Sequence, residues 1–210
     1  CVGCGALFQL LCPRCFQLLT FFDRADTQLL ATQLPRNEST YPFTSLQVAC
    51  HYTGVARKLL FAYKYQGIID FGTVIGNILY YTLSLPQFNC VTYVPLHPRK
   101  RALRGFNQTQ ILAEIIAAKL RVPCLPLILK TKHTNSQMSL LDHEARKENS
   151  AMVFAPHPLN QTMLTADFDR DSVLLVDDVI TTGATLMACA AVLQKLGFQE
   201  IHGVVFAHGH

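Results

Sequence analysis

The sequence has no hydrophobic run long enough to cross a membrane, little charge and no tryptophan. Its longest apolar stretch, residues 71–85, is interrupted by polar side chains and is shorter than the ~20 residues of a membrane-spanning helix, so we interpret it as a core helix. Only 15% of the residues are charged and half are hydrophobic, which is enough apolar surface for a well-packed core. The net charge of +4 allows polyanionic partners without requiring them, and the absence of tryptophan excludes nothing.

Size and cysteine usage favour a cytoplasmic protein with one main domain and an appendage. The 210 residues show no signal-like segment. Four cysteines are scattered among apolar neighbours, and we expect them to be reduced core residues: Cys50, Cys90, Cys124 and Cys189. A secreted disulfide-bonded protein is the alternative reading of this cysteine content.

The other four cysteines form two CxxC pairs at the start of the chain. Cys1 and Cys4 are followed, after seven residues, by Cys12 and Cys15. Each CxxC is a turn that directs two thiolates at one point, so the pair of turns predicts a tetrahedral Cys4 site for structural zinc. Redox dithiols and disulfides are the alternatives. A closed Cys4 site has no open coordination position and would support folding or docking rather than hydrolysis.

The periodicity divides the chain into three parts and predicts an α/β fold. We expect a small zinc-finger-like domain at residues 1–22, a polar linker at residues 23–44, and an α/β domain at residues 45–210. Expected strands cover residues 46–52, 90–95, 123–129, 172–176 and 201–206. Expected helices cover residues 18–22, 55–65, 71–85, 107–120 and 186–196, with Gly67 and Gly197 as stop signals.

The chain is organised around residues 172–185, which read Ser-Val-Leu-Leu-Val-Asp-Asp-Val-Ile-Thr-Thr-Gly-Ala-Thr. Two carboxylates, Asp177 and Asp178, follow a buried apolar strand, and a loop of threonines and one glycine leads into a helix. Helix N-termini bind phosphate, while carboxylates suit sugar hydroxyls or a metal ion. The junction therefore predicts a site for a phosphorylated sugar. Simple helix capping is the alternative for the two acids alone.

A second strand-to-helix junction carries a basic cluster, Arg99-Lys100-Arg101-Ala-Leu-Arg104. Such a cluster could be a solvated face, could neutralise a diphosphate, or could bind a nucleic-acid backbone. Upstream, Tyr63-Lys64-Tyr65 ends the expected helix 55–65. Its tyrosines are either partly buried core residues or a base-stacking platform beside basic residues.

Two further segments carry open alternatives. Residues 130–154 are long and polar, which favours a mobile lid over the active site, with a surface hairpin or helix as the alternative. The tail His208-Gly209-His210 could bind a metal, but a solvent-exposed tail is the simpler interpretation.

Four features in one order resemble the ComF family (ComFC/GntX type) of bacterial proteins linked to natural competence. They are the paired CxxC turns, Tyr-Lys-Tyr-Gln-Gly at 63–67, Val-Pro-Leu-His-Pro-Arg-Lys-Arg-Ala-Leu-Arg-Gly-Phe-Asn-Gln at 94–108, and Val-Asp-Asp-Val-Ile-Thr-Thr-Gly-Ala-Thr at 176–185. A spaced pattern of this family falls on Lys130, Thr134, Gln137, Leu140, Arg146, Asn149 and Phe154, with Lys130 in place of arginine. Lysine keeps the charge there but loses the guanidinium fork.

The resemblance implies a type I phosphoribosyltransferase fold, a mostly parallel sheet flanked by helices, that binds phosphoribosyl diphosphate (PRPP) with Mg²⁺. Asp177 and Asp178 would contact the ribose hydroxyls and take the catalytic role. The implied PRPP-binding residues also include Val179, Thr181, Thr182, Gly183, Ala184, Thr185, His97, Arg99 and Lys100. The family is also implicated in handling incoming single-stranded DNA, for which the candidates are Lys64, Arg101, Arg104 and Arg146.

The resemblance and the motifs together predict a PRPP-binding, phosphoribosyltransferase-like protein that acts in natural transformation. Structural Zn²⁺ and PRPP-bound Mg²⁺ are the expected metals, and competence-machinery proteins such as a helicase are possible partners. Because no base-binding segment stands out, the acceptor of a phosphoribosyl transfer is left open. A DNA-binding module without turnover and a PRPP-sensing regulator are the alternatives.

Overall fold

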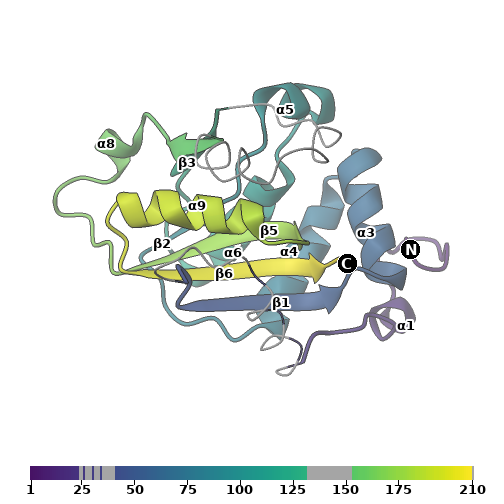
Figure 1. The fold of residues 1–210 in the computed structure, drawn as a ribbon. Helices are drawn as coiled ribbons and strands as arrows, with labels where there is room; N and C mark the ends of the chain where they lie inside the picture. The colour runs from purple at the N-terminus through teal and green to yellow at the C-terminus, as the bar shows by residue number, and fades with distance from the viewer. Residues whose placement is uncertain (24–25, 27–29, 31–33, 35–40, 132–152, 210) are drawn as a thin grey trace, which may run out of the picture.

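A parallel four-stranded sheet forms the centre of the molecule (Figure 1). The computed structural model describes residues 1–23, 26, 30, 34, 41–131 and 153–209. The strands lie in the order β1 (Ser45–His51), β6 (Glu200–His208), β5 (Ser172–Ile180) and β2 (Cys90–Tyr93). All three neighbouring pairs are parallel. The central strands β5 and β6 are almost entirely buried, as expected for a sheet covered on both faces.

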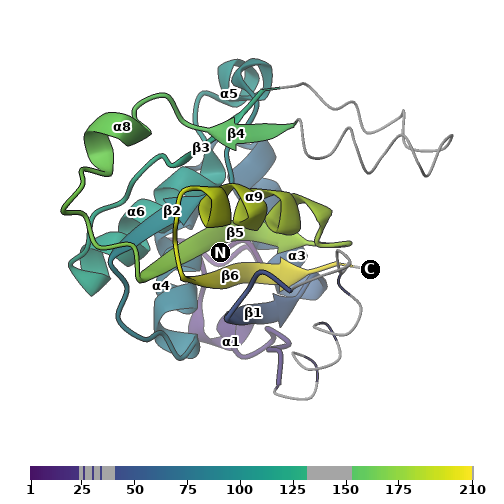
Figure 2. The same ribbon diagram turned by 60° about the vertical axis from the view of Figure 1, so that its left-hand side comes forward.

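Helices cover both faces of this sheet (Figures 1 and 2). One face carries α3 (Gly54–Tyr65), α4 (Asp70–Thr82) and α6 (Gln108–Leu120), and the other carries α9 (Ala184–Lys195). Side chains alternate across a strand, so Leu174 and Val176 belong to the first core cluster, whereas Val173 and Leu175 belong to the second. The two clusters sandwich the sheet. Among the described helices, none combines the length and hydropathy needed to cross a bilayer.

The stop signals and most expected elements agree with the structure. Gly67 and Gly197 have the left-handed φ angles of residues that follow a helix, +66° and +92°. The structure adds one helix that the charge pattern concealed, α5 (Pro98–Arg104), which has proline in its first turn and ends at left-handed Gly105.

The expected helix at residues 18–22 is wrong. The only helix of the cysteine segment is α1 (Pro13–Phe16), and the chain then runs extended beside β1. His51 donates its backbone N–H to the Thr20 carbonyl, Phe22 donates to Ala49, and Phe21 forms an antiparallel bridge with Cys50. β1 is the outer strand of the sheet, so these bonds satisfy backbone groups that an edge strand would leave open.

The expected strand 123–129 is also wrong in extent. Cys124 forms only an isolated bridge with Val91, and the strand proper is β3 (Ile128–Lys130). β3 pairs with β4 (Phe154–Pro156) in a separate antiparallel hairpin above α9, and a short helix, α8 (Asn160–Met163), follows. The centre of the predicted lid, residues 132–152, lies outside the described residues, including Arg146. Its two ends pair, because Lys130 is the register partner of Phe154.

Both ends of the chain lie closer to the core than the sequence indicated. Cys12, Cys15 and Leu19 join the core cluster of α3, α4 and α6, although Leu7 and Phe8 remain exposed. The expectation of a solvent-exposed tail is wrong for His208, which is buried in β6 as the register partner of His51. Most of the segment predicted to be a linker, residues 23–44, lies outside the described residues. Two of its leucines, Leu30 and Leu34, are buried in the second cluster.

Candidate functional site

The sequence had indicated that the two aspartates follow a strand, but both lie inside β5. The pairing of β5 with β2 ends at Val176, whereas its pairing with β6 continues to Ile180. Asp177 and Asp178 therefore lie where the sheet narrows from four strands, next to the carboxyl end of β2. Strand ends of this kind, at a change in neighbouring strands, are the usual ligand sites of open α/β sheets.

Strand alternation sends the two carboxylates to opposite faces of the sheet. Asp178 turns toward α3, where its Oδ1 accepts a hydrogen bond from Lys64 Nζ at 2.7 Å. Both side chains are largely buried, at 18% exposure for the lysine and 12% for the aspartate. Burial lowers the pKa of Lys64, but Asp178 and then Asp177 outweigh it and raise that pKa above its ordinary value. Lys64 is therefore a firmly charged partner of this carboxylate.

Asp177 turns toward α9 and the β3–β4 hairpin. It accepts the backbone N–H of Asp178 at 2.8 Å and lies within electrostatic reach of Lys130. Burial, followed by repulsion from Asp178, raises the pKa of Asp177 to about 8. Lys130 in turn has its pKa lowered by burial and by repulsion from Lys100 of α5. The structure thus gathers two carboxylates and three lysines, from α3, α5 and β3, around one end of β5.

The loop after β5 adds hydroxyls and backbone N–H groups to this cluster. Thr181, Thr182, Ala184 and Thr185 are exposed, and Gly183 takes a left-handed φ of +75° at the N-cap of α9. Together with Asp177, these residues line a cavity of ≈ 40 Å³. The twelve-residue helix α9 begins there with no side-chain cap and no acidic residue in its first turn. The Ala184 N–H is directed at Thr182 Oγ1 at 3.5 Å, and the other N–H groups of this first turn, with the positive dipole end, favour an anion at this point.

The loop is backed by a residue that no local sequence signal indicated. A Cβ added to Gly183 would lie 2.2 Å from Leu34 Cδ2, so the leucine side chain packs directly against the glycine. Leu34 is only 4% exposed and belongs to the segment predicted to be a linker. This contact holds Gly183 where a larger residue has no room.

The basic junction is built on α5. The His97 side chain caps this helix by accepting the backbone N–H of Arg99, so the structure gives His97 a positioning role next to the site. Arg99, Lys100 and Arg101 are exposed on the helix. Arg104 bonds Gln108 of α6 at 3.1 Å and lies over the Tyr65 ring. Of the predicted DNA contacts, Arg101 and Arg104 are thus on α5, whereas Lys64 lies in the carboxylate site.

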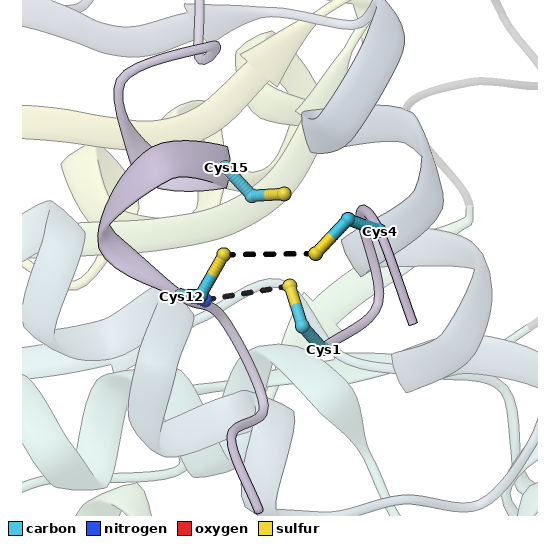
Figure 3. Close-up of side chains that lie close together, drawn as sticks. All are labelled: Cys1, Cys4, Cys12 and Cys15. Atoms are coloured by element: carbon cyan, nitrogen blue, oxygen red, sulfur yellow. Dashed lines mark hydrogen bonds between the residues drawn. The ribbon is translucent and has the colours of Figure 1, made fainter. Parts of the chain in front are cut away.

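The four N-terminal cysteines converge on one point, and Figure 3 shows their sulfurs directed at one another. All four Sγ atoms lie within 4.8 Å of one another, and the Cys4 and Cys12 sulfurs are 3.7 Å apart. Zn–S bonds of about 2.3 Å in a tetrahedron place sulfurs about 3.8 Å apart, so the spacing fits zinc. Cys12 also donates its backbone N–H to Cys1 Sγ at 3.4 Å, which orients that thiolate.

Comparison with known proteins agrees with this geometry. Competence protein F of Haemophilus influenzae is 31% identical over 161 residues, which cover 72% of this chain and 67% of that protein. The chain belongs to the competence protein F (ComF) family. The phosphoribosyl transferase domain family also matches residues 110–210, the part that contains β5, the threonine loop and α9. The predicted type I phosphoribosyltransferase fold, with an N-terminal cysteine cluster, is thereby confirmed for this ComF protein.

Solved structures show more distant similarity. Glutamine PRPP amidotransferase from B. subtilis is 17% identical with a TM-score of 0.42, over 64% of this chain. The ComF chain spans only a quarter of that enzyme. Adenine phosphoribosyltransferase from Thermoanaerobacter pseudethanolicus is 14% identical with a TM-score of 0.41, over 69% of this chain and 83% of that one.

Proposed function

We propose that this ComF protein binds PRPP with Mg²⁺ at the carboxyl end of β5. In this proposal Asp177 and Asp178 hold the ribose hydroxyls and the loop 181–185 holds the 5′-phosphate. Val179 lies in β5 between the aspartates and this loop. Arg99 and Lys100 of α5 and Lys130 of β3 neutralise the diphosphate, and His97 orients α5. The observation that carries the proposal is the strand end itself, where a buried carboxylate pair adjoins a helix N-terminus that has glycine at its N-cap.

The residues fit a magnesium ion delivered with PRPP. Mg²⁺ is commonly bound by one or two carboxylates together with substrate phosphates. The pKa of Asp177 is raised although Lys64 and Lys130 lie near it. The lysines therefore do not fully neutralise the carboxylate pair, which leaves room for a cation. Bound Mg²⁺ would supply charge neutralisation for a departing diphosphate. The described residues would then orient the ribose and exclude water. With an acceptor in the site the result is phosphoribosyl transfer, and without one the protein senses PRPP.

Calorimetry with PRPP and Mg²⁺ tests the proposal. We expect Asp177→Asn/Asp178→Asn to weaken binding at least about a hundredfold, since it removes both ribose contacts and the charge that attracts Mg²⁺. The matched control is Asp167→Asn/Asp171→Asn, which makes the same two substitutions at exposed positions before β5. Equal affinity of the two double variants, or no PRPP binding by the parent protein, contradicts the proposal. Diphosphate release with candidate acceptors separates an enzyme from a sensor.

We also propose that the four cysteines bind structural zinc, supported by their sulfur spacing. The cysteines form no disulfides, in keeping with a reducing, cytoplasmic location.

A second candidate function, handling of single-stranded DNA during natural transformation, rests on the exposed cations of α5. It predicts steeply salt-dependent binding that Arg101→Gln/Arg104→Gln reduces more than Arg121→Gln/Lys195→Gln, a control of equal charge. A role for Arg146 and contacts with competence-machinery proteins belong to the same proposal.

A further inference from the structure

We infer that Phe61, Tyr65 and Arg104 form a platform on which the bases of single-stranded nucleic acid stack. This inference deepens the DNA-handling half of the proposed function and rests on it. It assigns base contact to three residues on α3 and α5 and leaves phosphate contact to the cations around them. Figure 1 shows both helices above the carboxyl ends of the strands, on the side where the PRPP site is proposed.

The platform consists of two exposed rings and one guanidinium plane. Phe61 and Tyr65, one helical turn apart on α3, have ring centroids 5.2 Å apart at an angle of 44°. They are 54% and 64% exposed, so each keeps an open face. The Arg104 Cζ lies 5.2 Å from the Tyr65 centroid, and its Nη1 is anchored by Gln108. Aromatic rings and guanidinium planes are the surfaces on which unpaired bases stack.

The scaffold under the platform is rigid. Tyr63, between the two exposed rings, is fully buried and donates its hydroxyl to the Gln108 carbonyl at 2.9 Å. Lys64 is held by Asp178. Tyr63 and Lys64, which precede Tyr65 in α3, are thus fixed. Gln108 anchors both parts of the platform: its backbone carbonyl binds Tyr63, and its side chain binds Arg104. The two exposed rings therefore need little ordering when a ligand stacks on them.

The charge of the two helices selects a polyanion as the occupant. α3 carries three cations and α5 carries four, with no acidic residue in either helix: Arg57, Lys58, Lys64, Arg99, Lys100, Arg101 and Arg104. A second aromatic pair, half-buried Tyr80 and exposed Tyr81, lacks this setting. Its only described cation is Lys119, and its helices α4 and α6 carry Asp70 and Glu114. Lys64 is paired with Asp178, but the other six cations surround the rings without an acidic residue on either helix. Open rings in this setting match a strand of nucleotides, each with a flat base and a phosphate, better than an acidic peptide.

Stacking and phosphate attraction can be separated by measuring affinity for two ligands of equal charge. We expect the parent protein to bind a fluorescent oligothymidine more tightly than an abasic oligonucleotide of the same length. The variant Phe61→Leu/Tyr65→Leu keeps the charge and the helix but removes both rings. It should bind oligothymidine about five- to a hundredfold more weakly, while its affinity for the abasic strand and its salt dependence stay unchanged.

The control is Tyr81→Leu, which removes a ring that is 72% exposed on α4. We expect it to leave both affinities unchanged, and we expect Arg104→Lys to keep the salt dependence while weakening only oligothymidine binding. Equal affinity of the parent protein for both oligonucleotides, or no effect of the double variant, overturns the platform. If the parent protein binds neither oligonucleotide, the DNA-handling proposal fails with it, whereas PRPP binding measured by calorimetry is unaffected by that result.

Discussion

Asp177 is a carboxyl group whose surroundings oppose its ionisation. It is buried beside a second carboxylate, and these two effects raise its pKa from 3.8 to about 8. In the unfolded chain the group ionises near its ordinary pKa. Between about pH 4 and pH 8 the folded state therefore binds more protons than the unfolded state, and this group makes the protein less stable as the pH rises through that window.

The substitution Asp177→Asn is therefore expected to stabilise the free protein. It removes the titrating group but keeps a side chain of the same size and its acceptor for the Asp178 N–H. We expect the melting temperature of the variant to exceed that of the parent by about 5 °C at pH 8 and by much less at pH 5. Thermal unfolding across this pH range checks the expectation, with exposed Asp171→Asn as the control. Parallel pH profiles for Asp177→Asn and its parent would show that burial of this carboxylate carries no stability cost.

The ion pair between Lys64 and Asp178 joins residues that are far apart in sequence. The spacing around residues 172–185 was enough to predict that two carboxylates, a threonine loop and a helix N-terminus lie together, and Asp177 and residues 181–185 do line one cavity at the start of α9. Lys64 was predicted to contact DNA, because its place in the sequence between two tyrosines does not reveal that it faces a strand 114 residues away. Local patterns indicate which side chains share a face of one element, but only the packing of α3 against the sheet determines which strand that face meets.

At the scale of elements, the sequence predicted most helices and strands, and the errors have physical reasons. Residues 18–22 have the leucines and phenylalanines of a helix, yet the open edge of β1 supplies extended pairing instead. The helix α5 was not predicted, because its four cations were interpreted only as a charged cluster, although Pro98 and Gly105 mark its ends. β5 continues beyond the apolar residues 173–176, because β6 lies beside it as far as Ile180. The backbone of β6 forms hydrogen bonds with polar residues as readily as with apolar ones.

The contact between Leu34 and Gly183 joins two elements and makes a testable pair. Gly183→Ala must adopt a left-handed backbone and also displace the Leu34 side chain. Gly105→Ala, at a φ of +78° with no atom within 4 Å of the added Cβ, has only the first of these costs. We expect Gly183→Ala to destabilise the protein by about 1–3 kcal/mol more than Gly105→Ala, and to weaken PRPP binding.

Chemical denaturation of a double-mutant cycle measures this contact. Because Leu34→Ala opens the space that the new methyl group needs, it should recover a large part of the additional cost of Gly183→Ala. Strict additivity of the two substitutions would mean that the leucine does not restrain the loop.

The cysteine cluster connects with the whole molecule through two routes. Cys12, Cys15 and Leu19 share a core cluster with α3, α4 and α6, and Gly3 lies against the Cys15 side chain. The residues that follow, 20–22, pair with the edge of β1. A metal that fixes the cysteines therefore also fixes the chain that covers this edge, so we expect the first 22 residues and the α/β sheet to unfold together.

Removal of zinc from the zinc-loaded protein tests this coupling. A chelator, or the substitution Cys12→Ser, should lower the melting temperature of the sheet itself, by about 5 °C or more, and the protein should still unfold in one transition. The control is Cys124→Ser, because Cys124 is half-buried and lies outside the cysteine cluster. Two separate transitions, with the larger one unchanged by the chelator, would show that the cluster is an independent finger. A single lowered transition means that zinc at one end of the chain stabilises the phosphoribosyltransferase fold, because metal that binds only the folded state stabilises every element that unfolds with the metal site.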